Sequence, residues 1–220
     1  MSMIAKETGN LSIEKLEAGV YTGISSMLVD LGLQESEKFE KTQRKMLIIW
    51  DIVDEYIEIN GEKLPRTITK EYGFSLGEKS NLRKDLQAWR GKPFTEEELQ
   101  GFNLLNILNK PCQLQIILEE KNGKKYNNIA SIMALGKGMQ IAPLEETCHF
   151  DLEDEETFVN WGYVPRWVQE KIKKAQNYTS SGLESYVKDY EAALKEAENF
   201  SSSDIAYGEN YGGNVDDLPF

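Results

Sequence analysis

The sequence has few of the residues on which most enzyme mechanisms and metal sites depend. A single histidine, His149, occurs among the 220 residues, which excludes most nucleophile–histidine mechanisms and nearly all histidine-based metal sites. The two cysteines, Cys112 and Cys148, lack CxxC spacing and are expected to be reduced, buried thiols. No GxxxxGK[ST], GxSxG or HExxH motif is present. These absences favour a binding protein over an enzyme, and no cofactor is expected.

Long apolar runs are also missing. No stretch approaches the roughly 20 apolar residues that a membrane span needs, and the first ten residues contain no apolar signal-peptide core. We therefore expect a cytoplasmic protein that does not contact a membrane. The acidic run Asp151–Glu156 lacks the glycine and the ligand spacing of a calcium loop, so we interpret it as linker charge rather than a metal site.

The charge is unevenly distributed along the chain. The net charge of −12 argues, taken alone, against binding to a phosphate backbone. Residues 61–140, however, hold 13 basic and 9 acidic side chains, whereas residues 141–220 hold 6 basic and 17 acidic ones. This asymmetry is typical of a basic binding module followed by an acidic tail.

The apolar pattern predicts five strands and two helices in the first 140 residues. Asn60-Gly61 and Asn122-Gly123 are strong signals for tight hairpin turns. A helix over Ser80–Trp89 and a second one, with a capping box formed by Thr95 and Glu98, stand between the third and fourth strands. On the second helix, Phe102, Leu105 and Leu108 are expected to face a core. The predicted strands are Gly19–Leu33, Arg44–Ile59, Leu64–Leu76, Cys112–Glu119 and Lys125–Leu135.

This β-β-β-α-β-β order predicts a mainly β fold with helices, an OB-fold-like five-stranded barrel. Residues 1–140 would form the barrel domain, and residues 141–198 a linker, over 142–156, with a helical extension. A helix is expected over Val164–Gln176. A further helix is expected to open at a second possible capping box, Ser181 and Glu184, with an apolar stripe from Leu183 to Ala197. These C-terminal helices precede residues 199–220, which are rich in Ser, Gly, Asn and Asp. We expect residues 199–220 to form a disordered acidic tail.

The last residues carry a resemblance to a known family. Asp216, Asp217, Leu218, Pro219 and Phe220 are similar to the acidic C-terminal tip of bacterial and phage single-stranded DNA-binding proteins. Leu218 stands where the common form has isoleucine, and Val215 where a further acid is often found. The resemblance implies that this tip docks replication or recombination proteins. A partner can bury the Phe ring and hold the carboxylates with basic side chains.

The resemblance also implies binding of single-stranded DNA (ssDNA) without sequence specificity, during phage or bacterial DNA replication and recombination. Such binding needs cations along a groove and aromatic faces for bases to stack on. On the third strand, residues 66, 70, 72 and 74 share one side and could present a cation–aromatic surface. The candidate ssDNA-binding residues are Trp50, Lys63, Arg66, Lys70, Tyr72, Phe74, Arg83, Lys84, Lys124, Lys125 and Tyr126.

Two other functions stay open at this point. An OB-like protein-interaction adaptor that does not bind DNA is the main alternative, and a nuclease or other carboxylate enzyme is the third hypothesis. The apolar stripe Leu183–Ala197 must pack on the barrel or on a copy of itself, because such a stripe is not stable in water. We favour a homo-oligomer for this stripe.

Overall fold

A computed structural model describes residues 15–36, 41–59 and 61–208; for residues 36 and 198–208 it describes the backbone alone. The protein is mainly β, with a curled antiparallel sheet of five strands in the order β3-β2-β1-β4-β5. All five predicted strands are confirmed, with ends that shift by a few residues. Their bounds are Gly19–Ser36 for β1, Lys41–Ile59 for β2, Glu62–Gly73 for β3, Pro111–Lys121 for β4 and Lys124–Met133 for β5.

The long strand β1 gives the sheet its curl. Its first residues pair with β4 and the rest pair with β2, so Gly23 lies opposite both Ile52 and Cys112. A Cβ atom at Gly23 would stand 2.6 Å from Leu114 Cδ1, which explains why glycine occupies the point where the two pairings meet. Bulges follow near Ser25 and Asp30, and such bulges bend a strand and increase its twist. The sheet therefore forms a half-barrel whose edges, β3 and β5, approach each other.

Both faces of the sheet are buried around its centre. On β2, Met46, Ile48 and Trp50 belong to the inner cluster, whereas Leu47 and Ile49 belong to an outer one. Side chains alternate between the faces of a strand, so a continuous apolar run results when both faces are covered. The inner face is closed by helix α1 (Asn81–Arg90) through Leu82, Leu86 and Trp89.

The segment after α1 differs from the prediction. The capping box of Thr95 and Glu98 is present, but helix α2 spans only Glu96–Gln100 and ends at Gly101, whose backbone is extended. A 3-10 turn, η1 (Leu104–Ile107), follows. The expectation that Leu105 faces the core is wrong, because this side chain is exposed; residues 102 and 108 do pack against the core.

The region predicted as a linker, residues 142–156, instead contributes to the fold. Strand β6 (Cys148–Phe150) pairs in parallel with β1, and a 3-10 helix, η2 (Glu155–Tyr163), follows it. Phe150 and Leu152 are buried in the outer cluster. The acidic run also has a structural use, since Asp151 and Glu153 both form ion pairs with Arg44 of β2. Tertiary packing gives this weakly patterned segment a fixed position.

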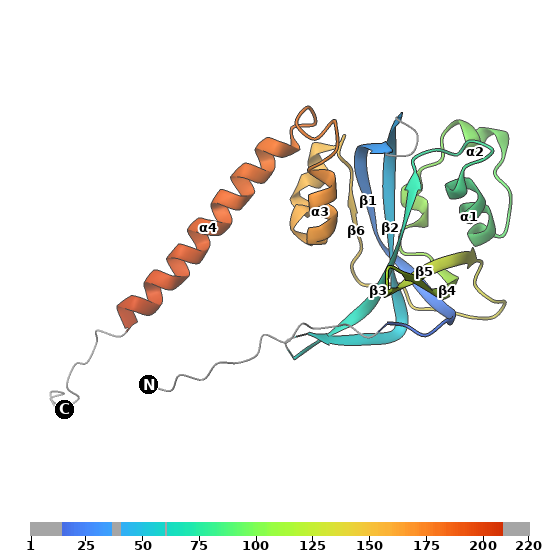
Figure 1. Cartoon of the computed structure of the whole chain (residues 1–220), viewed down its shortest axis with the longest axis horizontal. Helices are drawn as coiled ribbons and strands as arrows, with labels where there is room; N and C mark the ends of the chain where they lie inside the picture. The colour runs from blue at the N-terminus through green and yellow to red at the C-terminus, as the bar shows by residue number, and fades with distance from the viewer. Residues whose placement is uncertain (1–14, 37–40, 60, 209–220) are drawn as a thin grey trace, which may run out of the picture.

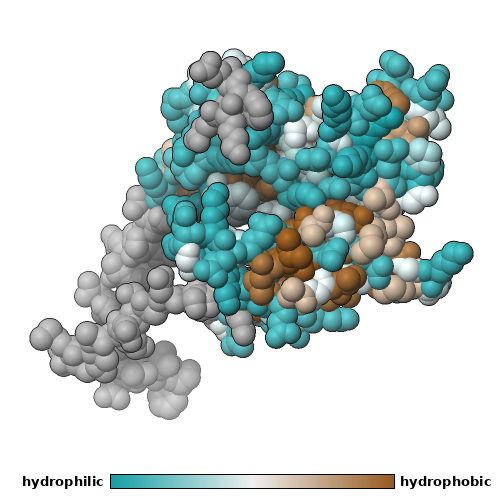
Figure 2. All heavy atoms as spheres, turned by 45° about the vertical axis from the view of Figure 1, so that its right-hand side comes forward, coloured by the Kyte–Doolittle hydropathy of each residue, from teal (hydrophilic) through white to brown (hydrophobic). Residues whose placement is uncertain are grey.

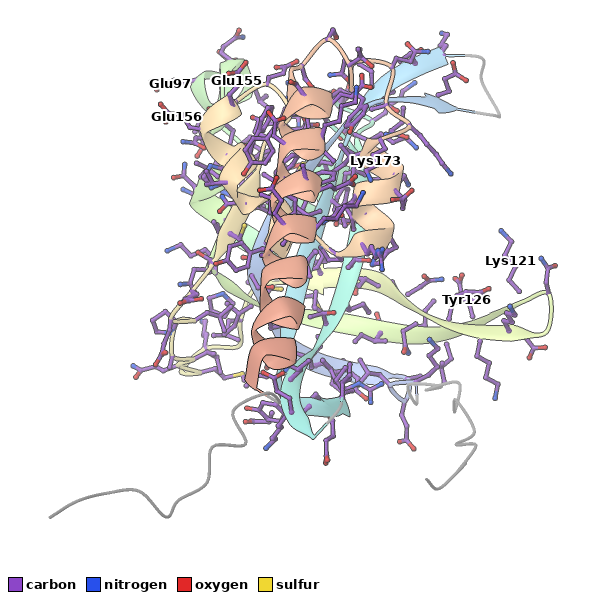
Figure 3. The ribbon with its side chains drawn as sticks, turned by 90° about the vertical axis from the view of Figure 1, so that its left-hand side faces the viewer. Glu97, Lys121, Tyr126, Glu155, Glu156 and Lys173 are labelled. Atoms are coloured by element: carbon purple, nitrogen blue, oxygen red, sulfur yellow. The ribbon has the colours of Figure 1, made fainter. Side chains whose placement is uncertain are left out.

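Two C-terminal helices complete the outer layer. Helix α3 (Arg166–Ile172) is shorter than predicted and lies on the opposite side of the sheet from α1 (Figure 1). Helix α4 (Leu183–Gly208) projects away from the body in the same view, and it continues past residue 199, where the tail was expected to begin. Lys173, labelled in Figure 3, pairs with Glu191 of α4 at 3.2 Å.

The apolar stripe of α4 packs over its first half. Leu183 and Val187 are buried in the outer cluster, and residues 186 and 190 pack against it. Leu194 is 47% exposed. The stripe therefore contacts the body at its base and is open to solvent further along the helix. Figure 2 shows that exposed apolar side chains also gather on one side of the body.

Candidate nucleic-acid interface

Two of the aromatic side chains expected to stack on bases lie in the core. Trp50 is 0% exposed, and its ring centroid is 5.8 Å from that of Trp89. Tyr72 is also buried, and its hydroxyl donates a hydrogen bond of 2.8 Å to Asp85. Burial and the Asp85 carboxylate together raise the pKa of Tyr72. The predicted cation–aromatic surface of β3 is thus wrong, because the side that holds Ile68 and Tyr72 faces inward.

Four more of the predicted ssDNA-binding residues, at positions 70, 74, 83 and 84, do not lie together in one groove. Lys70 forms an ion pair of 2.8 Å with Asp85 and donates to the Ile129 carbonyl of β5, so its charge helps to hold the two sheet edges together. Phe74 lies under the guanidinium of Arg44, 4.5 Å from its ring centroid. On α1, residue 83 donates to the carbonyl of residue 76, and residue 84 is exposed.

A hollow of about 370 Å³ opens where the edges β3 and β5 approach each other. We call it the seam hollow. Its floor is closed by Leu16, whose backbone N–H and carbonyl bond the side chain of Asn127 at 2.9 and 2.8 Å. Residues from five parts of the chain meet here. They are Lys15, Leu16, Ile57, Arg66, Thr67, Ile68, Thr69, Tyr126, Asn127, Asn128 and Trp167.

Two half-exposed aromatic rings border the seam hollow. Tyr126 of β5 is 45% exposed, as expected of a stacking candidate, and Trp167 of α3 is 54% exposed. Trp167 is not among the binding residues that the sequence predicts, because α3 falls in the predicted helical extension. A signal was present: the buried stripe of this helix contains Val168 and Ile172, and Trp167 lies outside it. A large aromatic residue outside the apolar stripe indicates an exposed ring.

The seam hollow is also cationic. Lys15 and Arg66 line it, and none of the described lining residues is Asp or Glu. Phosphate groups would therefore meet positive charge from Lys15 and Arg66 here.

The β4–β5 hairpin adds two lysines on the face of Tyr126, where Glu119 lies directly opposite the ring. It projects from the body, with Lys121 near its tip and Tyr126 closer to the sheet (Figure 3). Lys121 pairs with Lys124 across the hairpin, so both point to the same face as Tyr126, two residues further on. Lys125 pairs with Glu120 and points to the other face.

Lys121 and Lys124 carry like charges at directly opposite positions, which destabilises a strand pair. Within the part of the chain that the structure describes, neither forms an ion pair with a carboxylate. A bound anion would relieve this repulsion. The Asn122-Gly123 turn, with φ of 53° and 73°, holds the two lysines at the tip.

Lys63, the two cysteines and the C-terminal tip are the predicted residues that have not yet been placed. The ammonium of Lys63 lies 4.0 Å from the ring centroid of Tyr56, at the β2–β3 hairpin. Cys112 is buried, as expected, whereas Cys148 is half-buried. The partner-docking tip, Asp216 to Phe220, lies outside the described residues.

No protein-family model matches the sequence, and no curated protein shows significant similarity to it. Among the described residues, no helix is both long and apolar enough to cross a bilayer. The same residues contain no group of three or more His, Cys, Asp or Glu side chains arranged to hold a metal ion.

Proposed function

We propose that this protein binds single-stranded DNA without sequence specificity, and that the strand lies in the seam hollow and along the Tyr126 face of the β4–β5 hairpin. The observation that carries the proposal is the joint exposure of Tyr126 and Trp167 in a hollow lined by Lys15 and Arg66 and by no described carboxylate. Stackable rings and backbone-tracking cations are what sequence-tolerant binding requires.

The strand arrangement supports an OB-like fold as the framework of this site. A long first strand pairs with both the second and the fourth, and a helix stands between the third and the fourth. OB-folds bind oligonucleotides over strands 2 and 3 and through the loop between strands 4 and 5. In this chain the seam hollow takes residues from β2 and β3, and the hairpin tip is the loop between β4 and β5.

Single strands would be preferred to duplexes, because their base faces are free to stack on the two rings. The phosphates would contact Arg66, Lys15 and the two lysines at the hairpin tip. Thr67, Thr69 and Asn128 add hydrogen-bonding groups to the lining. Phosphate contacts and base stacking read no base edge, so the binding would tolerate any sequence.

Within this proposal, the protein acts in phage or bacterial DNA replication and recombination. The segment from Asp216 to Phe220 would recruit partner proteins through its ring and its charges. The exposed part of the α4 stripe, around Leu194, would mediate homo-oligomerisation. Sedimentation velocity tests the last point: Leu194→Glu should reduce the oligomer, and a monomer at every accessible concentration would reject it.

A fluorescence titration with oligo-dT and with duplex DNA tests the DNA binding. Intrinsic tryptophan emission should be quenched by oligo-dT and much less by the duplex. Affinity should fall with salt, with a log–log slope of about −0.7 for each phosphate neutralised. No quenching, or an affinity that does not respond to salt, would overturn the proposal and favour a protein-interaction adaptor. DNA cleavage on addition of magnesium would instead support the nuclease alternative.

A further inference from the structure

A second recess lies along the outer side of β2 and has a different character from the seam hollow. Two adjoining hollows, of about 430 and 750 Å³, share Asp51 and are bounded by residues 140–148, which follow β5. We call them together the acidic trough. Its apolar surface comes from both walls, and includes Met27, Ile49, Val53, Ile141, Leu144 and Tyr163.

The charge of the acidic trough is of one sign. Asp51, Asp54, Glu145 and Glu146 line it, and its described lining residues include no lysine, arginine or histidine. Lys63 approaches one end, over the ring of Tyr56. Burial raises the pKa of Asp51, although Ser26 donates a hydrogen bond of 2.6 Å to it. A cationic occupant would satisfy these carboxylates, and nucleic acid would be repelled by them.

The regular pairing of β2 with its neighbours is interrupted at the same place. Its pairing with β3 jumps from Asp51 to Tyr56, and its pairing with β1 ends at Ile52. Residues 53–55 thus pair with neither neighbour in the sheet register, and Asp54 has a φ of 63°. An extended peptide could use the main-chain groups of these residues, as in other cases where a peptide adds to a strand.

The opposite wall is held in place from β1. The side chain of Asn109 accepts a hydrogen bond of 2.9 Å from the Leu144 N–H and donates one of 3.0 Å to the Leu144 carbonyl. The N–H of Asn109 in turn donates to the Ser25 carbonyl of β1 at 2.8 Å. Because this wall is already fixed, binding to it costs less conformational entropy.

We propose that the acidic trough binds an extended segment of a partner protein in which lysine or arginine alternates with apolar residues. Side chains of an extended peptide point alternately to two sides. The basic ones would reach Glu145 and Glu146 of one wall, while the apolar ones pack against Ile49 and Val53 of the other. This site is separate from the DNA site and does not depend on it, because the two linings share only Thr67.

The test uses the full-length protein without DNA and three fluorescein-labelled ten-residue peptides, measured by anisotropy at low salt. The peptides are (Lys-Val)5, (Glu-Val)5 and deca-lysine. We expect (Lys-Val)5 to bind more tightly than either of the others. The double variant Glu145→Lys/Glu146→Lys should weaken its binding about tenfold or more. Tyr163 is 70% exposed, and Tyr163→Ala removes its apolar surface. This variant should also weaken the binding of (Lys-Val)5.

The matched control is Glu96→Lys/Glu97→Lys on α2, which makes the same change in net charge at two exposed acids outside the trough lining. Binding of (Lys-Val)5 should stay within about twofold in this variant. An equal loss in the control, or binding of deca-lysine as tight as that of (Lys-Val)5, would show attraction by net charge alone and overturn the proposal. Circular dichroism confirms that each variant is folded, and the trough variants should not weaken oligo-dT binding, since Glu145→Lys/Glu146→Lys only adds positive charge near the DNA site.

Discussion

Lys171 of α3 is bonded through its ammonium group to the carboxylate of Glu71 on β3, and this ion pair ties the helix that carries Trp167 to the outer face of the sheet. Lys45 of β2 shares the same carboxylate at 2.9 Å. Three elements therefore meet at Glu71. A partly buried charge cluster therefore helps to position the helix that carries the exposed Trp167 ring.

This cluster predicts a pH-dependent contribution to stability. Burial acts to raise the pKa of Glu71, but the hydrogen bonds from Lys171 and Lys45 outweigh it and lower the pKa below its ordinary value of 4.5. A lowered pKa in the folded state contributes stability above the ordinary value, which is lost as the pH falls through the folded pKa. Glu71→Gln should destabilise the protein by about 1 kcal/mol at pH 7.

Urea denaturation between pH 7 and pH 3 measures this effect. The difference between wild type and Glu71→Gln should shrink as the pH falls below 4.5. The exposed Glu96→Gln on α2 serves as the control and should have little effect at any pH. A difference that is equally large at pH 7 and pH 3 would contradict the assignment.

The fluorescence of Trp167 alone should account for most of the quenching on DNA binding. The other three tryptophans, at positions 50, 89 and 161, are buried. Trp167→Phe keeps a ring for stacking and should abolish most of the quenching while retaining most of the affinity. Trp167→Ala should cost about 1–3 kcal/mol, the range for one stacked base. Tyr163→Ala is the control and should change neither the quenching nor the affinity. Quenching that persists in Trp167→Phe would mean that the bases stack elsewhere.

Removing the like-charged pair at the hairpin tip should have opposite effects on stability and on binding. Lys121→Ala/Lys124→Ala should relieve repulsion between directly opposite lysines and leave the free protein as stable or slightly more stable. It should weaken ssDNA binding and reduce the salt slope by about 0.7 for each phosphate that the lysines no longer neutralise. Lys84→Ala on α1 should change neither quantity. An unchanged salt slope in the double variant would remove the hairpin from the site.

Trp50 should matter for folding and not for DNA. Trp50→Phe removes part of a fully buried ring system packed against Trp89. Thermal unfolding should show a loss of stability smaller than the roughly 3–5 kcal/mol typical of truncating such a ring to alanine. Oligo-dT affinity should stay the same at temperatures where the variant is folded. A selective loss of affinity would mean that the core opens when DNA binds.

The proposed tip predicts a separation of two functions. Phe220→Ala removes the anchor ring and keeps the charges, so it should weaken capture of replication or recombination proteins with little effect on DNA affinity. Replacing Asp216 and Asp217 by Asn should slow partner encounter and tighten DNA binding, because tethered acids compete with phosphates for the same lysines. Pulldown from a bacterial or phage-infected lysate measures the first effect. If Phe220→Ala captures all that wild type does, the tip has no docking role.

Local pattern in the sequence determined the strands and their order. Apolar periodicity located all five, and Asn122-Gly123 fixed the β4–β5 hairpin, because both signals act within a few residues. The same local rule identified the capping box of Thr95 and Glu98. The exposure of Tyr126 could be anticipated as well, since its neighbours are polar.

Only the tertiary structure decided which face of each strand is buried. Trp50 and Tyr72 became core residues because the sheet curls around α1, a relation between segments that periodicity does not encode. The same holds for residues 148–163, which cover the outer face, and for Trp167, which α3 brings into the same hollow as Tyr126. The pattern of a strand in the sequence shows which of its residues share a face. Which side meets another layer depends on contacts between distant segments, and those contacts placed the cations and rings of the seam hollow together.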